Sequence, residues 1–185
     1  MGIGLKKDGV MKRELKVDIE KFERLYTRNI DVNNRIIYFC PWQPNEEMVA
    51  DDKIWEVNDW TVQNIIKGLH FLEIRNHRYI TINWLSYGGD WDSGIALFDI
   101  IKEIKSPVRI KAYGRICSMG TVILQACKER LLAPNCLFMI HYGTAGQDSI
   151  QAKYSREKLQ DFMKYDKYLT PKEAIELGLA DGIIK

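Results

Sequence analysis

The chain has 185 residues, of which 46% are hydrophobic and 28% charged, as is ordinary for one soluble globular domain. Its 27 basic and 25 acidic side chains leave a net charge of +2, which argues against a nucleic-acid-binding surface. No apolar run reaches the roughly 18 residues of a membrane span, and the N-terminal segment lacks the apolar core of a secretory signal. We therefore expect a cytoplasmic protein with no membrane or nucleic-acid partner.

The predicted elements alternate between strands and helices along the chain. Strands are expected over 35–40, 79–85, 108–110, 130–133 and 136–140. Helices are expected over 18–28, 59–74, 122–127 and 149–163, with two more that begin at caps formed by Asp92 and by Thr170-Pro171. Such alternation predicts an α/β fold around a mostly parallel sheet with right-handed crossovers.

Four cysteines lie mostly within apolar runs, without a C-x-x-C pair or a histidine at ligand spacing. They are Cys40, Cys117, Cys127 and Cys136. This pattern predicts buried, reduced thiols and no metal site. Cys117 adjoins Ser118, and we expect its side chain to point away from that serine, into the core.

The stretch from Gly114 to Gly120 contains the first candidate for catalysis. A β-branched run precedes it and an apolar run follows it, which predicts that Ser118 occupies a sharp turn between a buried strand and a buried helix. Free backbone N–H groups and the helix dipole favour developing negative charge at such a position. The turn is therefore suited to a nucleophile.

Two other polar sites follow predicted strands. The glycine pair Gly88-Gly89 comes after the 79–85 strand, and His141 comes after the 136–140 strand. In open α/β sheets the functional site lies outside the carboxyl ends of the strands. The glycine pair, Ser118 and His141 are thus expected to meet.

Several motifs, in this order, resemble the ClpP serine peptidases, the proteolytic subunit of the ATP-dependent Clp protease. The resemblance covers roughly residues 35–184. Its motifs are the Ser-x-Gly-Gly loop, the Gly-x3-Ser-Met-Gly turn, Leu-Ala-Pro-Asn, Met-Ile-His, Asp-x-x-Leu-Thr-x-x-Glu-Ala and the closing Glu-x-Gly-Leu-Ala-Asp. It implies a ClpP/crotonase-like fold of repeated β-β-α units around a mostly parallel sheet.

The resemblance also implies roles for individual residues. Ser118 matches the nucleophile, His141 the general base and Asp166 the acid that orients the imidazole, while the backbone N–H groups of Gly89 and Met119 match the oxyanion hole. No metal or cofactor is implied. The implied partners are a peptide or unfolded-protein substrate, further copies in a homo-oligomeric ring, most readily a heptamer, and a Clp-type AAA+ unfoldase.

We divide the chain into an N-terminal segment, 1–34, with a short helix, and a single peptidase domain, 35–185. Between His141 and Asp166 the family has a longer handle helix and strand through which two rings stack. This chain has room there for a reduced handle only, at about 143–165.

Four single positions also depart from the family pattern. Tyr165 replaces an arginine before the acid, and Tyr87 replaces a proline in the glycine loop. Thr81 and Asn83 stand where the family often has two aromatic residues that line the docking pocket for the ATPase.

Each assignment has an alternative. Ser118 could simply fill a tight turn, His141 could be a core histidine, and Asp148 or Asp161 could replace Asp166. A crotonase-type acyl-CoA hydratase or isomerase would use the same oxyanion hole with carboxylates as acid and base. A structural ring subunit would have a triad that is no longer aligned.

Overall fold

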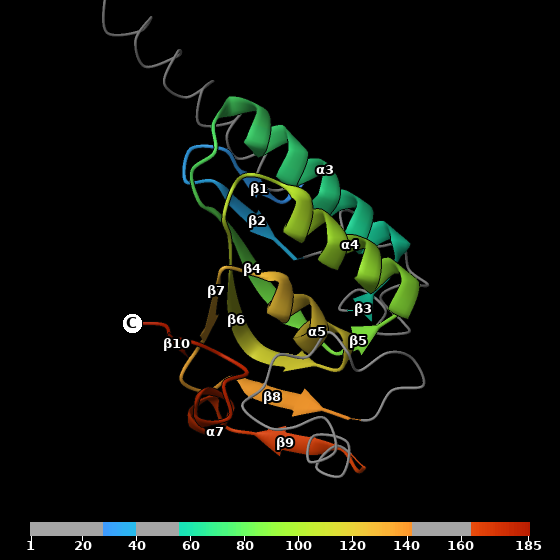
Figure 1. Cartoon of the computed structure of the whole chain (residues 1–185), viewed down its shortest axis with the longest axis vertical. Helices are drawn as coiled ribbons and strands as arrows, with labels where there is room; N and C mark the ends of the chain where they lie inside the picture. Colours follow the sequence, from blue (N-terminus) through green and yellow to red (C-terminus); the bar gives the residue numbers. More distant parts are fainter. Residues whose placement is uncertain (1–27, 40–55, 142–163) are drawn as a thin grey trace, which may run out of the picture.

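The computed structural model describes residues 28–39, 56–141 and 164–185 (Figure 1). Its main sheet has eight strands, in the order β1-β2-β4-β6-β7-β10, and β8 pairs with β6 and with β9. A second sheet pairs β3 with β5. The strands are β1 (Ile30–Asp31), β2 (Ile36–Tyr38), β3 (Glu56–Val57), β4 (Ile80–Ser86), β5 (Gly88–Gly89), β6 (Val108–Cys117), β7 (Glu129–Leu132), β8 (Leu137–Ile140), β9 (Lys167–Leu169) and β10 (Gly182–Ile183).

The sheet is mostly parallel, as predicted. Strands β2, β4, β6, β7 and β10 run parallel to one another, as β8 does to β6. Among the described strands, only the pairs β1–β2 and β8–β9 are antiparallel. The carboxyl ends of β4, β6 and β8 consequently lie near one another, where their following loops can converge.

Within the described residues, four helices accompany these strands: α3 (Asp59–Arg75), α4 (Trp91–Glu103), α5 (Met119–Ala126) and α7 (Pro171–Glu176). The predicted cap of α7 is confirmed, because Thr170 and Glu173 form a reciprocal capping box. The predicted cap of α4 is wrong. Asp90, not Asp92, accepts a hydrogen bond from the Ser93 N–H, at 2.7 Å, because α4 begins at Trp91.

Helices α3, α4 and α5 cover one face of the central strands (Figure 1). Alternate residues of β4, and of β6 as far as Ala112, are buried, whereas the intervening residues are half-buried. Helix α5 is buried along its whole length. Trp84 on β4 is the largest fully buried side chain and packs against Phe39, with ring centroids 4.3 Å apart.

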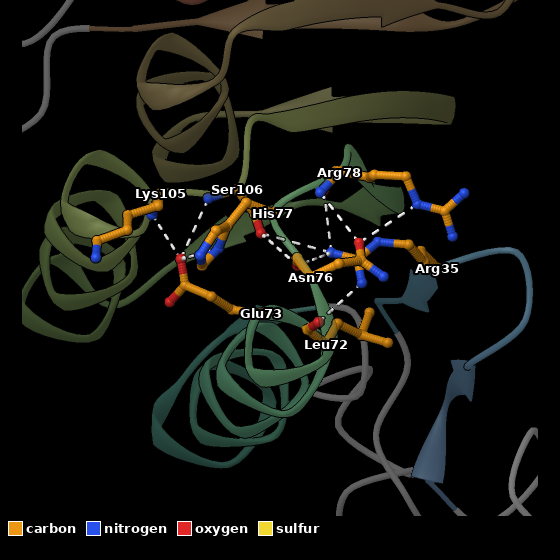
Figure 2. Close-up of polar contacts among 8 residues, drawn as sticks. All are labelled: Arg35, Leu72, Glu73, Asn76, His77, Arg78, Lys105 and Ser106. Carbon is orange, nitrogen blue, oxygen red and sulfur yellow. Dashed lines mark hydrogen bonds and ion pairs between the residues drawn. The ribbon is translucent and has the colours of Figure 1, made fainter.

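Arg35 joins the amino ends of the strands to the end of α3 (Figure 2). It is buried, and its guanidinium donates hydrogen bonds to the backbone carbonyls of Leu72, Asn76, Arg78 and Tyr79, at 2.8 to 3.1 Å. These acceptors include carbonyls at the carboxyl end of α3 that no helical N–H can reach. The buried charge thus caps a helix and fixes the loop that leads into β4.

Some predictions concern residues outside the described ranges. They are the helices at 18–28 and 149–163, the reduced handle and the burial of Cys40. The division at residue 34 stays a prediction, although β1 already joins the main sheet before that point. No helix in the described ranges is long and apolar enough to cross a membrane.

Candidate active site

Ser118 occupies the predicted turn between β6 and α5. Its backbone has φ 48° and ψ −121°, a conformation that non-glycine residues rarely adopt. Hydrogen bonds on both sides fix it: the Ser118 N–H donates to the carbonyl of Met139 at 2.9 Å, and the Ser118 carbonyl accepts from the Thr121 N–H at 2.9 Å. The strained turn holds the side chain at the end of a buried helix.

His141 directly follows β8 and reaches this hydroxyl. Strands β6 and β8 are parallel, with Cys117 in register with Met139, so the two chain segments leave the sheet side by side. The Ser118 Oγ lies 2.7 Å from the His141 Nε2, which is hydrogen-bond distance. The prediction that the residues after these two strands meet is confirmed for this pair.

Asp166 precedes β9 and lies on the other side of the imidazole. The antiparallel pairing of Ile140 with Lys167 makes His141 and Asp166 the next residues along the same ladder. The His141 Nδ1 lies 3.3 Å from the Asp166 Oδ1, and both side chains are partly exposed. A proton on Nδ1 satisfies this contact and leaves Nε2 as the acceptor for the serine hydroxyl.

The glycine loop lies directly against the serine. Gly88 has φ 105°, and a Cβ atom there would come within 2.6 Å of the Ser118 Cβ and 3.2 Å of its Oγ. Gly89 has φ 144°, and a Cβ atom there would lie 2.3 Å from the carbonyl oxygen of Val57 in β3. Only glycine fits at either position. Gly89, the predicted oxyanion donor, therefore directly follows the glycine that packs against the Ser118 side chain, and it is held by β3.

Met119, the second predicted oxyanion donor, is the first residue of α5. A backbone N–H at this position has no partner within its helix, so geometry leaves it available for a ligand. The Met119 side chain is buried against α4, where a Cβ atom on Gly94 would approach it to 2.3 Å. Close packing of the two helices therefore helps to hold the Met119 amide.

Sequence reasoning missed Gly94 and Val57. Both act on the site through backbone packing: Gly94 makes room for Met119, and Val57 pairs with Gly89. An isolated glycine within a helical pattern is the one signal that could have pointed to Gly94. A two-residue strand such as β3 offers no periodicity to detect.

The neighbouring thiol is not a competing nucleophile. Cys117 is buried, as predicted, and burial raises its pKa, which disfavours the reactive thiolate. Cys136 is also buried, and burial, followed by the proximity of Cys117, raises its pKa to about 12. Cys127 is only half-buried, but desolvation raises the pKa of its thiol as well. Within the described ranges, no cluster of three potential ligands could hold a metal ion.

Comparison with known proteins then identifies the family. The model of the family described as Clp protease matches residues 52–153, which is more than half of the chain and includes Ser118 and His141. The chain belongs to the Clp protease family. The matched range ends before Asp166, so the family match itself does not reach that residue.

Two similar proteins extend this result for the Clp protease family chain. It is 32% identical over 123 residues to an ATP-dependent Clp protease proteolytic subunit from Deinococcus radiodurans, with 52% of this chain and 60% of the relative covered. The chain thus spans about three fifths of that curated relative. A ClpP1 point mutant from Listeria monocytogenes matches with a TM-score of 0.68 and 24% identity, over 83% of this chain and 93% of that one. This structural match shows that the predicted ClpP-type fold is present.

Proposed function

We propose that this chain is a serine endopeptidase of the ClpP type that hydrolyses peptides or unfolded proteins. The proposal is supported above all by one continuous line of contacts: Ser118 Oγ to His141 Nε2 at 2.7 Å, and His141 Nδ1 to Asp166 Oδ1 at 3.3 Å. An unactivated serine attacks amides poorly at neutral pH, and a base within hydrogen-bond reach removes that obstacle. This order of contacts supports the roles that we propose for the three residues.

In the first half of the proposed reaction, the Ser118 Oγ attacks the scissile carbonyl while the His141 Nε2 takes the hydroxyl proton. The negative charge that develops on the carbonyl oxygen is stabilised by the N–H groups of Gly89 and Met119. The tetrahedral intermediate collapses as His141 donates its proton to the leaving amine. The products are the free amine and an ester between Ser118 and the acyl half of the peptide.

In the second half, a water molecule replaces the amine. The His141 Nε2 removes a proton from this water, which attacks the ester carbonyl, and the same two N–H groups stabilise the second oxyanion. The proton then returns to the Ser118 Oγ as the acid product leaves. Asp166 keeps the imidazole in the tautomer that accepts at Nε2 and stabilises the imidazolium formed in both halves.

Replacement of the nucleophile tests the proposal most directly. We expect Ser118→Ala to abolish cleavage of fluorogenic peptides and labelling by a fluorophosphonate probe, with no change in assembly by native mass spectrometry. Cys117→Ser is the matched control, because it alters the adjacent residue in the same strand and should still be labelled. Cleavage that survives in Ser118→Ala would refute the nucleophile assignment.

The alternative functions make different predictions. An acyl-CoA hydratase or isomerase would bind coenzyme A, which isothermal titration would detect, and would need two free carboxylates rather than the His141–Asp166 pair. A structural ring subunit with an unaligned triad would separate Ser118 from His141, whereas their 2.7 Å contact favours activity. The serine peptidase is therefore the function that we propose.

We further propose that the chain forms a homo-oligomeric ring, most readily a heptamer, and receives substrates from a Clp-type AAA+ unfoldase. Membership in the Clp protease family supports this proposal. Native mass spectrometry should give a mass that is a multiple of seven chains. Degradation of a folded, tagged protein should require both ATP and the unfoldase, whereas cleavage of short peptides should require neither.

A further inference from the structure

One arginine near the proposed active site has no acidic partner among the described residues. Arg115 lies on β6, three residues before Ser118, and its guanidinium carbon is 4.4 Å from the centroid of the Tyr87 ring. This is a cation–π contact, in which the ring orients the cation without neutralising it. No carboxylate in the described ranges forms an ion pair with Arg115.

Arg109, on the same strand, has a similar arrangement in which a carboxylate neutralises the arginine. Its guanidinium also stacks on a tyrosine, Tyr79, at 4.8 Å, but it forms an ion pair with Glu129 as well. Arg109 is near the start of β6, far along the strand from Ser118. Arg115 therefore differs from Arg109 because no described carboxylate neutralises its charge.

The Arg115–Tyr87 pair is close enough to meet a bound peptide. Tyr87 precedes Gly88, which packs against Ser118 so closely that a Cβ atom there would lie 3.2 Å from the Oγ. Arg115 itself is in register with Leu137 of β8, the strand that ends at His141. An extended peptide advances about 3.3 Å per residue, so three residues on each side of the scissile bond reach about 10 Å from it. Arg115 is three residues before Ser118 along β6, which is also about 10 Å in an extended strand.

We propose that Arg115, held against Tyr87, is a specificity-determining residue that favours peptides with an acidic side chain within three residues of the scissile bond. A carboxylate there would supply the ion-pair partner that Arg115 lacks, as Glu129 does for Arg109. Guanidinium and carboxylate groups fit one another in a bidentate geometry, which also fixes the position of the peptide. This inference rests on the proposed peptidase function, because it concerns the same site.

The experiment compares peptides that differ in one side chain. In a fluorogenic peptide with neutral side chains, Glu, Gln or Lys is placed in turn at each of the three positions on either side of the cleaved bond. We expect kcat/KM for Glu to exceed that for Gln by about fivefold at one of these positions, the upper end of the gain from a partly exposed ion pair. Raising the salt from about 50 mM to about 500 mM should reduce this ratio.

Variants then assign the preference to Arg115. Arg115→Gln should bring the Glu-to-Gln ratio to about one, Arg115→Lys should retain most of it, and Arg115→Glu should favour Lys instead. Lys111→Gln is the matched control: it removes a charge from the same face of β6, farther from Ser118, and should leave the ratio unchanged. Tyr87→Phe keeps the ring and should also keep the ratio, whereas Tyr87→Ala should lower it.

The outcomes separate this inference from the proposed function. No Ser118-dependent cleavage of any peptide would overturn both. Cleavage that depends on Ser118, but with a ratio near one at every position or a ratio unchanged in Arg115→Gln, would overturn only the role of Arg115. A ratio that falls equally in Lys111→Gln, or only together with loss of the native oligomer in Arg115→Gln, would also overturn it.

Discussion

Arg35 and Ser118 share a positive φ but have opposite environments. Both are non-glycine residues with positive φ, 56° and 48°. Arg35 precedes β2 at the amino ends of the parallel strands, and Ser118 follows β6 at their carboxyl ends. The Arg35 side chain is buried and surrounded by carbonyl acceptors (Figure 2), whereas the Ser118 side chain contacts a partly exposed histidine.

A positive φ at a non-glycine residue thus accompanies a structural role at Arg35 and a proposed catalytic role at Ser118. At Arg35, hydrogen bonds to four backbone carbonyls hold the conformation, and all of them also stabilise the fold. At Ser118, backbone hydrogen bonds hold the turn while the hydroxyl is left for His141. We therefore expect substitutions at the first site to reduce stability, and substitutions at the second to reduce activity.

The largest effect is expected at Asp166. Asp166→Asn should lower kcat by about 10³- to 10⁴-fold, because an amide at this position favours the wrong imidazole tautomer. The unfolding midpoint should hardly change, since the Asp166 side chain is more than half exposed. Steady-state cleavage of a fluorogenic peptide and thermal unfolding together measure both quantities. Asp161→Asn, at the neighbouring acid in the sequence, is the control, and a larger loss there would reverse the assignment.

Arg35 should show the opposite result. Arg35→Met removes the donors for four buried or partly buried backbone carbonyls, so the free energy of unfolding should fall by about 3 kcal/mol. Activity per folded molecule should remain near that of the native chain. Denaturant unfolding at one fixed protein concentration measures the change. The exposed Arg78 provides the control, because Arg78→Met should cost about 0.5 kcal/mol or less.

Gly88 tests whether the position of the Ser118 side chain matters for activity. Gly88→Ala would bring a Cβ atom to 2.6 Å from the Ser118 Cβ, so the serine or the loop must shift. A shift of about 1 Å should lower kcat about 10²-fold. Gly178→Ala imposes a similar positive-φ strain, at φ 77°, but at the end of α7. It should reduce stability without this loss of activity, and equal losses of activity in both variants would contradict the proposed positioning role.

Much of the site could be predicted from the sequence because its residues follow strands. Ser118 and His141 come directly after apolar runs, and parallel strands bring such positions to one edge of a sheet. Asp166 was harder, since only resemblance to the family distinguished it from Asp148 and Asp161. Its contact with His141 arises from the antiparallel pairing of β8 with β9, a three-residue strand without detectable periodicity.

Other features depended on contacts between segments far apart in the sequence. The role of Arg35 comes from carbonyls 37 to 44 residues away, which no local pattern indicates. The start of α4 was misplaced by two residues because Asp90 and Asp92 are equally good caps by residue type. Asp90 is the cap because α4 begins at Trp91, directly after the glycine loop.

The smallest predicted effect concerns the ion pair that fixes β10. Hydrogen bonds from Arg130 lower the pKa of Asp181, so its negative charge stabilises the fold at pH values above about 3.9, the ordinary pKa of aspartate. This stabilisation should disappear as the pH falls through the lowered pKa of the folded chain. Because Asp181 is partly exposed, solvent screening limits the effect to about 1 kcal/mol.

Denaturant unfolding between about pH 6 and about pH 2.5 should show this contribution as a decline that is shallower in Asp181→Asn. Glu103→Gln, at an exposed acid on α4, should leave the slope unchanged. An Asp181→Asn curve parallel to that of the native chain would mean that this pair adds no pH-dependent stability. The hydrogen bonds of Arg35 would then contribute more to stability than the Arg130–Asp181 pair. Their carbonyl acceptors do not titrate in this range, so these contacts persist in acid.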